Sequence, residues 1–200
     1  MENQQETYLN IHDSLVIDES VEKYENFEYQ PQTLANLNQQ GSIIYITVSN
    51  KDAWYHLNHS YIFIKGKLVK NYDKVYADGD MISITNNGIV GLFSRAELMI
   101  NSQIIESVGS PLQASTITKL TQKNPCDNDL TQLWSLDKTV AAAATNAGFS
   151  LRHNYIINNL AGNIKVCFTA LIPLKDIFWI VENYDKVLYG MQLDLKLRIK

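Results

Sequence analysis

The stretch LDLKLRIK, residues 193–200, alternates apolar and charged side chains without interruption. Successive side chains of a β-strand point to opposite faces of the sheet, so this period of two predicts a half-buried strand. We expect the apolar set to point inward: Leu193, Leu195, Leu197 and Ile199. We expect the charged set to point outward: Asp194, Lys196, Arg198 and Lys200.

Similar β-type patterns recur upstream and predict most of the chain as sheet. Strands are predicted at residues 43–48, 60–69, 81–85, 92–100, 148–157, 164–172 and 187–199. Turn residues separate several of them: Asn50-Lys-Asp52, Asp78-Gly-Asp80 and Asn86-Asn-Gly88. The longest connections between strands are 103–147 and 173–186. The pattern predicts an all-β protein, a sandwich of about eight antiparallel strands.

Two short helices are predicted inside these connections. One spans residues 110–122, where Pro111 occupies the favourable first position. The other follows Pro173 and runs to Glu182. Its apolar residues recur at helical spacing: Leu174, Ile177, Phe178 and Val181.

The charge divides the chain into an arm, residues 1–40, and a domain, residues 41–200. Residues 1–30 carry eight acidic residues against Lys23, a net charge of −7, and the rest carries 13 acidic and 16 basic residues, a net charge of +3. A short helix over 19–27, capped by Asp18, is a candidate. We expect the arm to dock on a sandwich, its own or a neighbour's, through its aromatic residues: Tyr24, Phe27 and Tyr29.

Composition sets expectations for location and partners. The small positive excess and acidic arm argue against direct binding to nucleic acid, because phosphate requires basic surfaces. The polar, acidic start lacks a secretory signal, and no apolar run is long enough for a membrane span. Cys126 and Cys167 suit a reducing compartment. We therefore expect an intracellular protein, cytoplasmic or nuclear and not secreted.

The histidines do not predict a metal site. They are His12, His56, His59 and His153. His56 and His59 could share an ion on a helix, but their stretch runs into a strand, where residues three apart point to opposite faces. We expect satisfied surface histidines and no metal.

The other reactive residues have structural interpretations, so no catalytic, cofactor-binding or metal residue is predicted. The acids at 78, 80, 127 and 129 suit turns and lack calcium-loop spacing. Cys167 lies in an apolar strand, where a buried thiol is inert, and Cys126 lies in a polar loop. The basic set favours a solvated strand edge: Lys65, Lys67, Lys70 and Lys74. Nucleophile and phosphate-loop motifs are missing, so we expect no enzyme, cofactor or small-molecule substrate.

Several segments in order resemble the first half of the double jelly-roll family. They are SYIFIKGKLVK (60–70), DMISITNNGIVGLFS (80–94), AELMINSQIIESV (96–108), GFSLRH (148–153), IPLKDIF (172–178) and YDKVLYG (184–190). The resemblance runs from about residue 14 to the end. Similar proteins are encoded by Polinton (Maverick) and adintovirus elements, viral elements integrated in animal genomes, and their better-known relatives are major capsid proteins.

This resemblance implies a structural, capsid-like protein that self-assembles. The family carries two jelly rolls in tandem and forms trimeric capsomers, so residues 41–200 are expected to be one jelly roll, a fragment of the two-roll plan. We expect self-association, as a trimer or higher.

Three alternatives stay open. The first is a β-sandwich binding module that holds a glycan or protein ligand, with Trp54, Tyr55 or Trp134 as stacking platforms. The second is an enzyme of unfamiliar type. The third is a genomic remnant without function.

Overall fold

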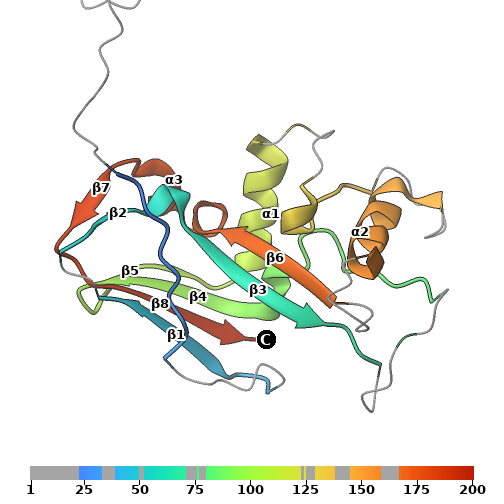
Figure 1. Cartoon of the computed structure of the whole chain (residues 1–200), viewed down its shortest axis with the longest axis horizontal. Helices are drawn as coiled ribbons and strands as arrows, with labels where there is room; N and C mark the ends of the chain where they lie inside the picture. The colour runs from blue at the N-terminus through green and yellow to red at the C-terminus, as the bar shows by residue number, and fades with distance from the viewer. Residues whose placement is uncertain are drawn as a thin grey trace, which may run out of the picture.

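The structure, a computed structural model, is an all-β sandwich with three short α-helices in its described part (Figure 1). It describes residues 23–32, 39–49, 52–70, 76, 80–122, 124, 129–137, 145–158 and 167–200. The larger sheet has the order β1-β8-β4-β5: β1 (Ile43–Val48), β8 (Leu193–Ile199), β4 (Phe93–Ile100) and β5 (Gln103–Val108). Two antiparallel ladders form the rest: β2 (Trp54–His56) with β7 (Val187–Tyr189), and β3 (Tyr61–Lys67) with β6 (Cys167–Pro173). The prediction of an antiparallel β-sandwich is confirmed.

The strand pairs are nested along the chain. The first strand pairs with the last, and successive inner strands follow: β1 with β8, β2 with β7, β3 with β6 and β4 with β5. This is the pairing of one long hairpin. A further ladder joins β4 to β8, so the innermost pair and the outermost pair share one sheet.

The core lies between the β3–β6 ladder and the larger sheet. Apolar residues from both layers belong to one buried cluster: Ile62, Phe168, Ala170 and Ile172 from the ladder, and Ala96, Leu98, Leu195, Leu197 and Ile199 from the sheet. In Figure 1, β3 and β6 run in front of that sheet. In β3 and β6, alternate residues therefore face the core and the outer side of the ladder.

Strand β8 confirms its inward set, and its outward set needs one correction. Leu193, Leu195, Leu197 and Ile199 are buried as expected. Asp194 was expected at the surface but is fully buried. It accepts hydrogen bonds from Thr47 Oγ1 at 2.6 Å and from Gln192 Nε2. Burial raises the pKa of the neighbouring Tyr45 phenol, and the charge of Asp194 and a hydrogen bond to it add to the rise.

Both predicted helices form. Helix α1 (Pro111–Gln122) begins at the proline, and the second is split into a 3₁₀ turn, η7 (Leu174–Asp176), and α3 (Trp179–Asn183). The apolar residues that predicted the second helix are all buried: Leu174, Ile177, Phe178 and Val181. None of the helices in the described ranges combines the length and apolar character needed to cross a lipid bilayer.

Two predicted strands are wrong. Residues 148–157 lie within helix α2 (Ala147–Asn158), which the Asn146 side chain caps by accepting hydrogen bonds from the amides of Gly148 and Phe149. Residues 81–85 form no strand, and side chains of α2 bond to two of their carbonyl groups: Ile82 O accepts from His153 and Ile84 O from Arg152.

Two connections also differ from expectation. The predicted 103–147 connection contains β5, which follows β4 through Asn101-Ser102, both with positive φ as in a tight hairpin turn. The predicted strand 187–199 is two strands in different layers, β7 and β8. Gly190, with φ 68°, lies between them, at a conformation that side-chain-bearing residues rarely adopt.

The arm contains no helix in its described part. Residues 23–30 have no regular structure, so the described half of the 19–27 candidate is wrong and its first residues lie outside the described ranges. Tyr24 and Phe27 are exposed, so their expected docking on this chain's own sandwich is wrong. Tyr29 is half-buried, and docking of the arm on a neighbouring chain stays a prediction. The segment meets the sandwich where the Gln32 amide donates to Tyr45 O of β1, at 2.8 Å.

We expect Gly66→Ala to destabilise the sandwich. Gly66 faces Phe168 across the β3–β6 ladder, and a Cβ there would lie 2.3 Å from the Phe168 ring. That buried ring would have to move, at a cost of about 1–3 kcal/mol in the free energy of unfolding, measured by urea denaturation. Gly109→Ala is the matched control, because a Cβ there meets no atom within 4 Å. Equal stabilities of the two variants would contradict the packing argument.

Candidate functional site

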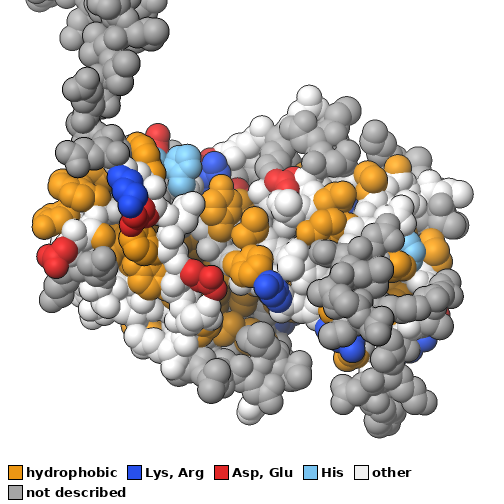
Figure 2. All heavy atoms as spheres, in the orientation of Figure 1, with side chains coloured by type: hydrophobic (Ala, Val, Ile, Leu, Met, Phe, Trp, Pro, Cys, Tyr) orange, Lys and Arg blue, Asp and Glu red, His pale blue; other side chains and the backbone are white. Residues whose placement is uncertain are grey.

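The outer sides of the two ladders carry large apolar side chains that face solvent. Along β3, Tyr61 is 52% exposed and Phe63 is 50% exposed, while Ile62 between them is buried. Phe63 lies directly opposite the half-buried Leu171 of β6. We call the whole set the outer apolar face: Trp54, Tyr61, Phe63, Leu171, Val187 and Tyr189. Figure 2 shows hydrophobic side chains over β2 and β7 at the left and over β3 in the centre of one face.

The three aromatic residues predicted as stacking platforms have different environments. Trp54 is 67% exposed and lies against Tyr189, its cross-strand neighbour, with ring centroids 4.7 Å apart. Tyr55 is half-buried on the opposite side of β2. Trp134 is 1% exposed, so it cannot stack on a ligand. Of the three, only Trp54 is exposed enough for the predicted role as a stacking platform.

His56 and His59 lie side by side, so the prediction that they point to opposite faces is wrong. A 3₁₀ turn, η2 (Leu57–His59), follows β2 directly and brings the two rings to 4.5 Å between centroids. Asp185, just before β7, joins them: its Oδ1 lies 2.6 Å from His56 Nε2. One ligand atom from each of the three residues lies within 4.8 Å of the others. The short 3₁₀ turn was not predicted from the sequence, because β-type residues precede and follow it.

A shallow polar hollow of about 130 Å³ lies on the outside of the larger sheet. Its lining is Arg95, Glu97, Lys196 and Arg198. The Glu97 carboxylate is shared, with Oε1 2.8 Å from Arg95 Nε and Oε2 3.1 Å from Lys196 Nζ. Arg95 and Arg198 are cross-strand neighbours of like charge. This arrangement neutralises the sheet surface in part and leaves it basic.

A buried polar cluster joins α1 to the connections around the sandwich. Lys119 is 1% exposed, and its Nζ lies 3.4 Å from Asp176 Oδ2 and donates to Asn87 Oδ1 at 3.0 Å. The ammonium also lies 5.4 Å from the centroid of Trp134. The lysine stem thus fills core space while its charge has three partners. We interpret this cluster as structural, because its charged groups face one another.

Arg152 forms a second buried polar contact. Its guanidinium donates to Ile84 O, to Ser135 O and to the Asp137 carboxylate. These bonds fasten α2 to residues 84, 135 and 137, which lie outside the strands of the described residues. His153, beside it, bonds to Ile82 O and stacks on Phe149, as a satisfied structural histidine would.

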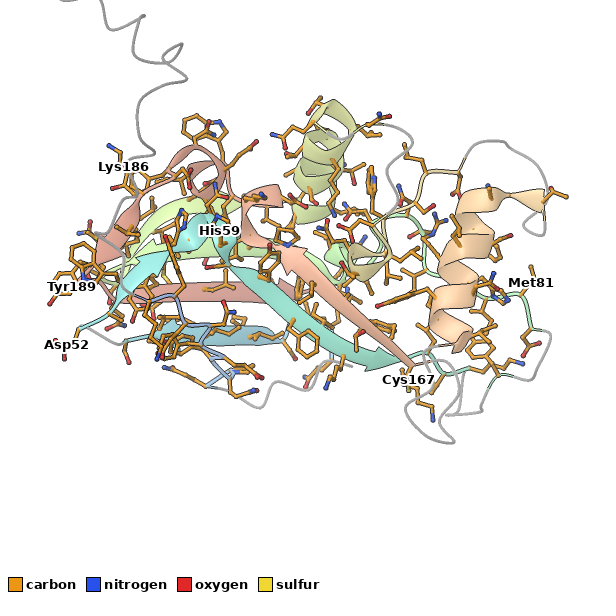
Figure 3. The ribbon with its side chains drawn as sticks, turned by 45° about the horizontal axis from the view of Figure 1, so that its top comes forward. Asp52, His59, Met81, Cys167, Lys186 and Tyr189 are labelled. Carbon is orange, nitrogen blue, oxygen red and sulfur yellow. The ribbon has the colours of Figure 1, made fainter. Side chains whose placement is uncertain are left out.

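The remaining residues weighed from the sequence are scattered. Lys65 lies over the Phe63 ring at 5.2 Å, and Lys70 pairs with Asp80 at 2.5 Å. Cys167 is a half-buried thiol at the far end of β6 from His59, as Figure 3 shows. Outside the described residues lie His12, Lys74, Asp78, Cys126 and Asp127.

We expect Lys119→Met to cost about 3–5 kcal/mol in the free energy of unfolding, because Asp176 would keep a buried charge without its cation. Chemical denaturation measures the loss. The control is Lys70→Met, which breaks a half-exposed ion pair and should cost less than about 1 kcal/mol. Adding Asp176→Leu to Lys119→Met should recover much of the loss, and equal effects of the two lysine variants would refute this account.

Neither a family model, nor a curated protein, nor a solved structure matches this chain.

Proposed function

We propose that this chain is a structural, non-enzymatic protein that self-associates, with residues 41–200 as one capsid-like jelly roll. The observation that carries the proposal is the outer apolar face on the β2–β7 and β3–β6 ladders. The resemblance to double jelly-roll capsid proteins adds the expectation of trimers or larger assemblies.

The strand pairing favours this assignment. A jelly roll is a double-sheet sandwich in which a long antiparallel hairpin is wrapped on itself. The four nested pairs of this chain have that order. The sheets differ from the jelly-roll plan in one respect: the β1–β8 pair shares its sheet with β4–β5, where alternation of the pairs between two sheets would place β3–β6.

The chemistry of the face suits protein–protein contact. Aromatic side chains dominate it, and aromatic residues are enriched in interfaces while lysine and acids are depleted from their centres. Lys65 and Lys67 continue the same side of β3, so they form a charged margin at one end. Full burial of an aromatic or aliphatic side chain stabilises an interface by about 1.5–3 kcal/mol. Five of the six residues keep about half or more of their surface exposed in the single chain.

The buried ionisable groups support a non-enzymatic role. Lys119, Asp176, Arg152 and Asp194 each contact partners that fasten one element to another. The hollow at Arg95 and Glu97 is shallow and crossed by ion pairs.

We expect the wild-type chain to associate reversibly at tens of micromolar, as sedimentation velocity would show. Phe63→Ser should shift this association to at least about tenfold higher concentration, since it removes an aromatic side chain of the face that is half exposed in the single chain. Ile117→Ser on α1 is the matched control: it removes a side chain that is 63% exposed but lies outside the face. A wild-type monomer at every concentration, or equal effects of the two variants, would refute the proposal.

A second candidate is a glycan-binding module, favoured by the exposed Trp54 beside Tyr189. Such an aromatic pair can stack on the apolar face of a sugar ring. On this view a glycan array gives a selective hit that Trp54→Ala abolishes, whereas the structural proposal expects none.

A further inference from the structure

The 3₁₀ turn between β2 and β3 places two histidines and an aspartate at one exposed point. We propose that His56, His59 and Asp185 form a binding site for a divalent transition metal ion of the Zn²⁺ class, with an open coordination position toward solvent. In Figure 3, His59 lies at the junction of the two ladders. The site needs residues from one chain only.

The ligand set fits such an ion. Two imidazole nitrogens and a carboxylate oxygen form one of the common three-ligand sets for Zn²⁺, with metal–ligand bonds of about 2.0–2.2 Å. Two tetrahedral ligands at that bond length lie about 3.3 Å apart. The three side chains bracket this value, from 2.6 Å between His56 and Asp185 to within 4.8 Å over the set. Small rotations of exposed side chains can supply the difference, since Asp185 has 72% of its side chain exposed.

The backbone that carries the ligands is held on both sides. Asn58, between the two histidines, donates from Nδ2 to Val181 O at 3.3 Å and to Glu182 O at 3.2 Å in α3. The turn closes through the Ser60 amide, which donates to Leu57 O at 2.9 Å. These bonds fix the turn against the segment that leads into Asp185. A metal would therefore meet ligands whose main chain is already ordered.

The β2–β7 register brings in the carboxylate. His56 pairs with Val187, and Asp185 lies two residues before Val187, so it is the diagonal neighbour of His56. Asp185 itself lies outside the strand, in the segment between α3 and β7, and this segment brings its carboxylate to the histidines from a part of the chain 129 residues away.

The residue types decide the class of ion. Imidazole binds Zn²⁺, Cu²⁺ and Ni²⁺, whereas Ca²⁺ and Mg²⁺ prefer an all-oxygen shell. Three ligands from one chain leave at least one position of a tetrahedral ion for water or another ligand. That position faces solvent, because His59 and Asp185 are both exposed.

The competing interpretation is a plain ion pair between His56 and Asp185. It explains the 2.6 Å contact but gives His59 no role. The ring of His59, 4.5 Å from that of His56, is therefore the discriminating feature.

The test is calorimetric titration of the full chain with Zn²⁺ after dialysis against a chelator. Cys126 and Cys167 are replaced by Ser throughout, so that no thiol competes. We expect one ion per chain, with affinity lowered at least about tenfold by His59→Gln and by Asp185→Asn, as loss of a ligand should be at least as costly as loss of an outer-shell partner. The control His153→Gln, a histidine outside the site, should leave the affinity unchanged.

Three results would overturn the inference. No heat of Zn²⁺ binding at up to millimolar concentration would exclude the site. Unchanged Zn²⁺ affinity in the His59→Gln variant would show that His59 is not a ligand and would leave only the His56–Asp185 ion pair. For the open position, the visible spectrum of the Co²⁺-loaded protein should change on addition of free imidazole, and an unchanged spectrum would rule that position out. Circular dichroism confirms that each variant is folded.

Discussion

The two-sided pairing of β8 is the constraint on which the rest of the sandwich depends. β8 is hydrogen-bonded to β1 on one side and to β4 on the other, so it holds together strands from the two ends of the hairpin. Its inward residues supply part of the core that the β3–β6 ladder covers. On the opposite side of β8, Asp194 accepts a hydrogen bond from Thr47 and Lys196 forms an ion pair with Glu97. Without this strand, β1 would have no partner in the larger sheet and the core would lose one wall.

Polar contacts then decide which surfaces remain uncovered. Buried Lys119 and Arg152 fasten α1 and α2 to connections between strands, where hydrogen bonds within a sheet are unavailable. The Glu106 carboxylate does the same for α3 by accepting from the amides of Trp179 and Ile180. The helices are therefore held at the sides of the sandwich, and the outer sides of β3 and β7 stay exposed to solvent. The outer apolar face lies on these exposed sides, whereas the proposed metal site lies beside α3.

The fold was more predictable than the site because strand alternation is local and the site is not. Residues 43–48 and 193–199 carry the period of two that core burial on one face requires. Residues 148–157 were predicted as a strand because Tyr155, Ile156 and Ile157 are β-type residues. The interactions that stabilise the helix instead are the Asn146 cap and the Arg152 contacts, and each comes from a single side chain. The His56–Asp185 contact depends on strand register across 129 residues, which no local pattern encodes.

Nested pairing also dictates the order in which the chain can fold. The β4–β5 hairpin can close as soon as its two-residue turn forms, but Thr47 of β1 must wait for Asp194, 147 residues later. During synthesis β1 is therefore made long before β8, its strand partner in the larger sheet. Such long-range closure slows folding and leaves strand edges exposed in the interval. We expect completion of the larger sheet to be limited by the pairing of β8 with β1 and β4.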